Sequence, residues 1–294
     1  EKRLKILYVQ GNHKVRRKEK RKKEAKQVLD IPNDIPIEFV ANIAQIQKNM
    51  GVSYLAEDEL IDIAKTLKTS RLVKKFLSDN LTMMSILRNA AQKLLTDKQL
   101  EDKIFGTFDE NLNIRPDATQ ELKNLYTSLR DNEKNLKTTV NALLNSASFS
   151  KHLQENIYTT RDDRIVFQVM ASSKSKVPGI VHDVSATSKT FYIEPEQIVP
   201  LNNKIREIKA NIHSEMVKIL SGLTSLVKNE IKELALSEQI LATIDYHFAK
   251  ARYAVNLCDD SVLKLAHALS LFTEDVGVNQ VIKSQTASLI LIHI

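Results

Sequence analysis

Hydrophobic residues recur every seven positions in two separate stretches of the chain, and each stretch predicts a long helix. In the first stretch, about 117–148, the recurring residues are Leu122, Leu129, Leu136 and Leu143. In the second stretch, about 201–233, they are Ile205, Ile212, Ile219 and Leu226. A seven-residue repeat keeps one side of a helix facing a partner helix. Each helix would reach roughly 45–50 Å at 1.5 Å per residue, and the matching lengths predict an antiparallel pair.

The residues between these two helices have a different pattern, which predicts a small β-module. Three runs of β-branched and aromatic residues, Arg164–Met170, Gly179–His182 and Thr190–Ile193, are separated by Ser, Lys, Pro and Gly. Such runs favour strands, and the residues between them favour turns. We therefore expect three or four strands within 157–200, at the tip of the helix pair.

The remaining hydrophobic pattern predicts a helical core. Amphipathic stretches occupy about 37–49, 56–68, 70–77 and 82–95, and two prolines before them predict a linker. The expected fold is mainly α with a small β-module. We expect five parts: a basic arm and linker (1–35), a helical core with the first long helix (36–156), the β-module (157–200), the second long helix with its return to the core (201–258), and the start of a further region (259–294).

Composition argues against several classes of chemistry on this chain. The six glycines stand singly at 11, 51, 106, 179, 222 and 277, whereas a phosphate-binding loop needs clustered glycines. The sequence contains no H-E-x-x-H, C-x-x-C or G-x-S-x-G motif. We therefore expect no catalytic, metal or cofactor site on the chain itself. One cysteine excludes a disulfide framework and favours a reducing, cytoplasmic location, and the sequence predicts no membrane partner.

The net charge of +7 comes from one end of the chain. Residues 1–30 hold 12 of the 43 basic residues but only 4 of the 36 acidic ones, so the remainder is nearly neutral. The run Lys14–Lys23 predicts an arm that binds polyanions. The alternative is a solvated, partly disordered terminus.

Basic residues also gather in the predicted β-module. They are Arg161, Arg164, Lys174, Lys176 and Lys189. Serine and threonine hydroxyls are interleaved with them. Cations with short hydrogen-bond donors suit phosphate oxygens better than base edges. This pattern favours nucleic-acid backbone binding, with an ordinary solvated hairpin surface as the alternative.

Several motifs resemble the bacterial MutS-two (MutS2) family, the MutS relatives that lack the mismatch-reading domain. The first four are Thr160-Arg-Asp-Asp-Arg164, Gly179-Ile-Val-His-Asp-Val-Ser185, Thr190-Phe-Tyr-Ile-Glu-Pro195 and Leu201-Asn-Asn203, and Ile244-Asp-Tyr-His-Phe-Ala-Lys-Ala-Arg-Tyr-Ala254 follows them. Their order and spacing match the family. The resemblance covers roughly 36–294, and Ala287–Ile294 is similar to the strand that precedes the family's ATP-binding loop.

The resemblance implies the helical core, lever helices and clamp of a DNA-handling ATPase, with the chain ending before the ATPase. ATP and Mg²⁺ belong to the full-length family, so no cofactor is expected here. Asp183, Thr190 and Glu194 fall on family motif positions. The expected nucleic-acid-binding residues are Arg161, Arg164, Lys174, Lys176, His182, Ser185 and Lys189, the lysines from their charge and loop placement alone.

Three functions stay open at this point. The first is a clamp that grips branched or duplex DNA in repair and recombination control, with a homodimer as an option. The second is a ribosome-associated quality-control factor that binds rRNA at collided ribosomes. The third is a structural helical scaffold without nucleic-acid binding. Phosphate contacts do not distinguish DNA from RNA, although the resemblance favours DNA.

Three local features allow sharper predictions. The acids of Arg161-Asp-Asp-Arg164 could suggest a metal site, but we favour ion pairs within the turn, because the two arginines would neutralise the acids. Where the family has Ser-Gly, this chain has Thr187-Ser188, which removes a glycine that tolerates positive φ. Glu194-Pro195 is expected to end a strand.

Overall fold

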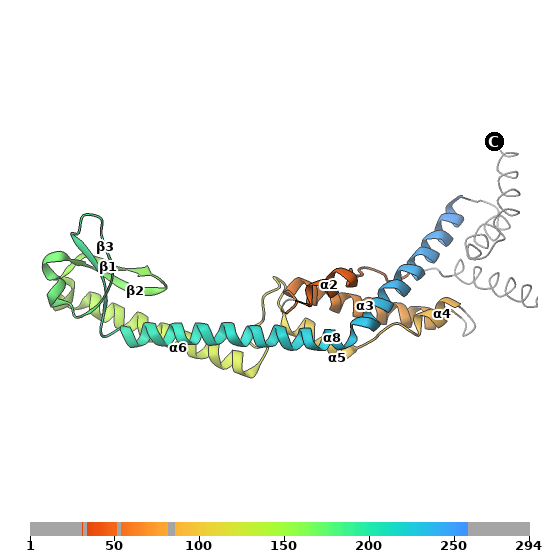
Figure 1. Cartoon of the computed structure of the whole chain (residues 1–294), viewed down its shortest axis with the longest axis horizontal. Coiled ribbons are helices and arrows are strands. Elements are labelled where there is room, and N and C mark those ends of the chain that lie inside the picture. Colours follow the sequence, from red (N-terminus) through yellow and green to blue (C-terminus); the bar gives the residue numbers. More distant parts are fainter. Residues whose placement is uncertain (1–30, 32–33, 52–53, 82–85, 258–294) are drawn as a thin grey trace, which may run out of the picture. The chain divides into compact units, whose positions relative to one another are not determined.

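The computed structural model describes residues 31, 34–51, 54–81 and 86–257 (Figure 1). The predicted basic arm at Lys14–Lys23 and the predicted region 259–294 lie outside these residues. The chain divides into two compact units. We call Gly106–Gly222 the sheet unit, and we call the residues up to Phe105 together with those from Leu223 the helical unit.

The helical unit contains α2 (Ile43–Asn49), α3 (Glu57–Asn80), α4 (Ile86–Ala91), most of α5 (Lys98–Thr107) and the last part of α8 (Val199–Leu257). Leu77 of α3, Leu87 of α4 and Ile244 of α8 belong to one buried cluster. Arg71 of α3 donates two hydrogen bonds to Glu101 of α5, at 2.9 and 2.8 Å. Burial of apolar side chains and an ion pair between α3 and α5 thus stabilise the helical unit.

Two helix predictions in this unit were wrong in detail. The stretches 56–68 and 70–77 form the single helix α3, and the stretch 37–49 becomes helical only at Ile43. The polar Thr69, at the expected break, is buried and donates from Oγ1 to the Phe39 carbonyl at 2.9 Å. A satisfied polar group can lie inside a helix, so the break in the hydrophobic pattern is not a break in the helix.

The sheet unit contains α6 (Gln120–Asn145), α7 (Ala147–Ser150), β1 (Leu153–Arg161), β2 (Arg164–Met170), the 3₁₀ helix η1 (Ala171–Lys176), β3 (Gly179–Val184), β4 (Thr190–Pro195) and the first part of α8. The four strands form one antiparallel sheet in the order β1-β2-β4-β3. The mainly helical fold with a small sheet is confirmed. The sheet begins at Leu153, slightly before the predicted start, and β4 ends at Pro195, as predicted.

Within the sheet unit, α6 and the first part of α8 run antiparallel (Figure 1). The hydroxyl of Thr119, just before α6, donates to Glu215 of α8 at 3.2 Å. Further along α6, Leu136 and Val140 share a buried cluster with Ile205, near the start of α8. The start of α6 therefore contacts a later part of α8, and a later part of α6 contacts the start of α8. Such contacts require the two helices to run in opposite directions.

The seven-residue pattern of α8 changes along its length. Ile205 and Ile212 are buried as expected, but Leu226 is 37% exposed. From Leu220 onward the buried positions lie one residue later than the predicted repeat, at Leu220, Val227, Leu234 and Leu241. A straight helix has 3.6 residues per turn, so it drifts about 20° per heptad relative to a strict repeat. The prediction of one seam through Leu226 was therefore wrong at its end.

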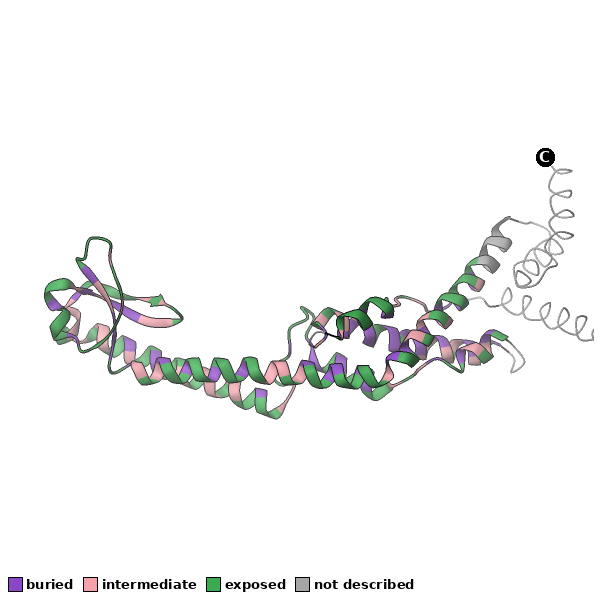
Figure 2. Ribbon diagram, in the orientation of Figure 1, coloured by how far each residue is buried: buried purple, intermediate pink, exposed green. Residues whose placement is uncertain are grey.

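The sheet packs on the helix pair through alternate residues of its two central strands. Phe167 and Val169 of β2 and Ile193 of β4 lie in the same buried cluster as Leu136 of α6, and Figure 2 shows the buried positions of these elements. Phe167 also meets Phe149 edge-on, with ring centroids 5.1 Å apart. Alternation along a strand leaves the residues between them on the opposite face.

Candidate nucleic-acid interface

The β1–β2 hairpin brings two of the predicted site residues to the sheet, but with unexpected partners. Asp162 and Asp163 both have positive φ, at 48° and 62°, as in a type I′ turn, and Arg161 pairs directly with Arg164 across the hairpin. The ion pairs predicted within this turn were wrong. The arginines lie on the strands, and their acidic partners are Asp183 for Arg161 and Glu194 for Arg164.

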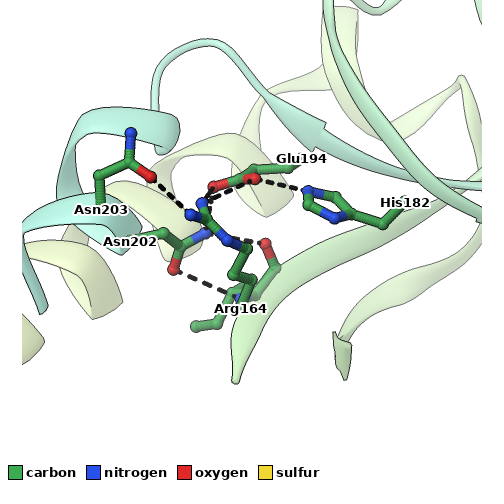
Figure 3. A network of polar contacts seen from close by, with 6 residues as sticks. Arg164, His182, Glu194, Asn202 and Asn203 are labelled. Carbon is green, nitrogen blue, oxygen red and sulfur yellow. Dashed lines mark hydrogen bonds and ion pairs between the residues drawn. The ribbon is translucent and has the colours of Figure 1, made fainter. Parts of the chain in front are cut away.

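Glu194 of β4 is the centre of a polar network at the junction of the sheet and α8 (Figure 3). Its side chain is 0% exposed. Arg164 donates from Nη1 to both carboxylate oxygens, at 2.9 and 3.2 Å. Asn202 donates from Nδ2 to Oε1 at 2.8 Å, and Nε2 of His182 lies 2.6 Å from Oε2. The carboxylate is thus fully paired inside the protein.

Two asparagines of α8 complete this network. Asn202 donates to the carbonyl of Ile165 at 3.1 Å and accepts its backbone N–H at 3.4 Å. Asn203 accepts a 2.6 Å hydrogen bond from Nη2 of Arg164. Residues from four sequence motifs therefore meet at one point, which fixes β2, β3 and β4 against the start of α8.

This geometry separates the predicted site residues into different roles. The side chains of Arg164 and His182 are only 14% and 17% exposed, and both are engaged by Glu194. The Oγ atom of Ser185 accepts the backbone N–H of Thr190 at 3.1 Å, so this hydroxyl helps to close the β3–β4 turn. We assign these three residues to the internal structure of the sheet unit.

Arg161 occupies an intermediate position on the sheet surface. Its guanidinium carbon lies 4.4 Å from the ring centroid of Tyr192, and its Nε lies 3.6 Å from Asp183. The side chain remains 39% exposed. Stacking and the ion pair orient the guanidinium, and the adjacent carboxylate reduces the local positive charge.

The three predicted lysines lie together at one end of the sheet, and a fourth lysine joins them. Lys174 and Lys176 belong to η1, and the carbonyl of Lys189 accepts the backbone N–H of Ala171 at 3.0 Å. Lys151 immediately precedes His152, whose carbonyl accepts the N–H of Met170 at 3.0 Å. We call Lys151, Lys174, Lys176 and Lys189 the lysine patch.

All four residues of the lysine patch are exposed, and none forms an ion pair with another residue of the described chain. The Nζ of Lys174 lies 4.6 Å from the ring centroid of Phe191, which orients this ammonium without neutralising it. Sequence reasoning missed Lys151. Its role depends on the pairing of β1 with β2, which the charge pattern does not reveal.

His152 provides a measure of the electrostatic environment of the patch. Its Nδ1 lies 3.1 Å from the hydroxyl of the buried Ser173. Burial lowers the pKa of His152, and the positive charges of Lys151 and Lys176 lower this pKa further. Both lysines therefore lie close enough to disfavour another positive charge, as expected of an uncompensated cationic surface.

Among residues 31, 34–51, 54–81 and 86–257, no group of three or more His, Cys, Asp or Glu side chains could hold a metal ion. No helix in those same ranges has the length and hydrophobicity needed to cross a membrane.

No family model matches the chain. Three similar proteins are each named endonuclease MutS2. The protein of Clostridium acetobutylicum is 35% identical over 205 residues, covering 69% of this chain and 26% of the relative. The protein of Brevibacillus brevis is 34% identical, covering 79% of this chain and 30% of the relative. The protein of Symbiobacterium thermophilum is 33% identical, covering 80% of this chain and 29% of the relative. The chain thus spans between a quarter and a third of the length of these relatives.

Proposed function

Since the chain belongs to the MutS2 family over the region that it shares with these relatives, we propose that it binds the phosphate backbone of DNA through the lysine patch. In this proposal the sheet is the clamp, and α6 and α8 are the levers that carry it. The relatives' name, endonuclease, refers to cleavage of nucleic acid, which favours a nucleic-acid partner over the role of a structural scaffold.

One observation supports the proposal most strongly. Four exposed lysines lie on neighbouring segments of the backbone at one end of the sheet, and none forms an ion pair with a carboxylate among the described residues. Phosphate contacts from such cations supply most of the affinity of nonspecific DNA binding. Ser172 and Ser175 of η1 are also exposed and can donate hydrogen bonds to phosphate oxygens. These contacts position a duplex without reading its sequence.

We assign backbone binding to the sheet unit, and we assign ATP and Mg²⁺ binding, any cleavage and the main homodimer contacts to parts of the relatives that this chain does not span. The names of the relatives give no reason to prefer a ribosomal target. Duplex RNA is therefore the competitor to use, rather than a second proposal.

The direct test is a charge reversal with a matched control. The variant Lys174→Glu/Lys176→Glu/Lys189→Glu should bind branched and duplex DNA at least about tenfold more weakly than wild type, because it replaces phosphate contacts with repulsion. The control reverses three exposed cations of α6, Lys123→Glu/Arg130→Glu/Lys134→Glu. Equal loss in both variants would show that net charge matters and that the patch does not.

A further inference from the structure

A second concave surface of the sheet unit lies away from the lysine patch, where the β1–β2 hairpin meets the helix pair. It is an open groove of ≈ 310 Å³. The groove is lined by α6, α8 and the hairpin, and its apolar lining residues are Leu136, Val140, Ile165 and Ile205. This volume is at the lower end of the range of small-ligand sites, so the groove suits a single small group.

The rim of the groove carries groups of three kinds. Lys137 of α6 and Lys209 of α8 are exposed cations, and neither forms an ion pair with a described residue. Glu133 and Asp163 supply carboxylates, and Tyr158 of β1 supplies an aromatic ring that is 43% exposed. The groove therefore offers cations, hydrogen-bond acceptors and a planar apolar surface within one site.

We propose that this groove binds one nucleotide that has left the stack of a nucleic-acid strand. A nucleotide matches all three kinds of group. Its phosphate suits Lys137 and Lys209, the amino and imino donors of its base suit the carboxylates, and its ring suits Tyr158 and the apolar floor. The inference rests on the proposed function, because the lysine patch is what would hold the rest of the strand.

The walls of the groove are held in place before any ligand arrives. Asn202, which lines the groove, exchanges two hydrogen bonds with the backbone of Ile165 and donates to the buried Glu194. The type I′ turn at Asp162 and Asp163 fixes the tip of the hairpin. A site built before binding loses less conformational entropy when the ligand binds.

The experiment compares three duplexes that differ at one position: fully paired, with one unpaired 2-aminopurine nucleotide, and with one unpaired abasic nucleotide. The complete chain should bind the 2-aminopurine duplex about tenfold more tightly than the other two, as expected for one stacked base. The fluorescence of the 2-aminopurine should also change on binding. Lys137→Gln/Lys209→Gln and, separately, Tyr158→Ala should remove this preference and leave affinity for the paired duplex unchanged.

The matched control, Lys134→Gln/Arg206→Gln, removes one exposed cation from each helix outside the groove lining and should keep the preference. Equal affinity for all three duplexes would overturn the groove proposal while leaving backbone binding in place. Persistence of the preference in both groove variants would also overturn it. Failure to bind any duplex would overturn the proposed function itself, so the two failures are distinguishable.

Discussion

Arg164 and Glu194 form an ion pair in the interior of the sheet unit, in which one guanidinium nitrogen contacts both carboxylate oxygens. Nη1 of the arginine lies 2.9 and 3.2 Å from these two oxygens. The pair joins the start of β2 to the end of β4. Glu194 is completely buried, and burial of an unpaired carboxylate is costly. Both residues belong to the motifs that carry the family resemblance, and their place in the structure gives those motifs a physical reason.

Removal of the arginine should therefore destabilise the sheet unit strongly. Arg164→Ala leaves the carboxylate of Glu194 buried without its main partner, and we expect a loss of about 3–5 kcal/mol in the free energy of unfolding. Urea unfolding measures this loss. The control is Arg161→Ala, because its ion pair with Asp183 is exposed and should contribute less than about 1 kcal/mol. Similar losses in the two variants would contradict the central role of Glu194.

The close approach of β3 to β4 requires a glycine at position 179. A Cβ atom there would lie 2.9 Å from both the carbonyl carbon of Glu194 and the Cα of Pro195. Backbone atoms cannot move aside easily, so Gly179→Ala should cost about 2–3 kcal/mol in unfolding free energy. A Cβ at Gly222 in α8 would meet nothing within 4 Å. Gly222→Ala should instead stabilise the protein by about 0.5–1 kcal/mol, and thermal unfolding of the two variants should shift in opposite directions.

Ser188 occupies a backbone conformation that favours glycine. Its φ is 56°, in the left-handed region, within the β3–β4 turn. The left-handed conformation costs a residue with a Cβ about 1–2 kcal/mol, and a glycine at this position would avoid that cost. The greater freedom of glycine in the unfolded chain offsets about 0.5–1 kcal/mol of this stabilisation. Ser188→Gly should therefore stabilise the protein by about 0.5–1 kcal/mol in urea unfolding, whereas Ser188→Ala should not. A destabilised glycine variant would show that the serine side chain matters more than the backbone.

The lowered pKa of His152 predicts a pH-dependent affinity for DNA. In the free protein, burial and the charges of Lys151 and Lys176 keep this pKa below its usual value of about 6.5. Bound phosphates would offset the charge of these lysines and raise the pKa, so the complex binds protons more readily than the free protein. Affinity should then increase as the pH falls from about 7.5 to 5.5. His152→Gln should flatten this dependence, and an equal pH response in the variant would contradict the prediction.

Local patterns predicted the elements of the fold better than they predicted side-chain partners. The repeat from Leu122 to Leu143 and the β-branched runs are patterns formed by residues close together in the sequence. The structure has a helix at the repeat and strands at the runs. The break expected after residue 68 was wrong, since the hydroxyl of Thr69 is satisfied by a carbonyl 30 residues away. Tertiary contacts of that kind leave no signal in a short window.

The candidate site shows the same limit. Arg161 and Arg164 were expected to pair with the acids beside them, because those were the nearest charges in the sequence. The type I′ turn instead places both arginines on strands, where partners from β3 and β4 are closer. Lys151 was missed for a related reason: only the pairing of β1 with β2 brings the residues that follow α7 beside η1.

The salt dependence of DNA binding tests the central claim most directly. We expect wild type and the variant Lys151→Gln/Lys174→Gln/Lys176→Gln/Lys189→Gln to differ in the slope of log K against log salt concentration, measured with one duplex DNA. Each lost phosphate contact should lower the slope by about 0.9, so four contacts predict a decrease of about 3.6. The contribution of all other cations cancels between the two proteins. An unchanged slope and affinity would contradict backbone binding by the lysine patch.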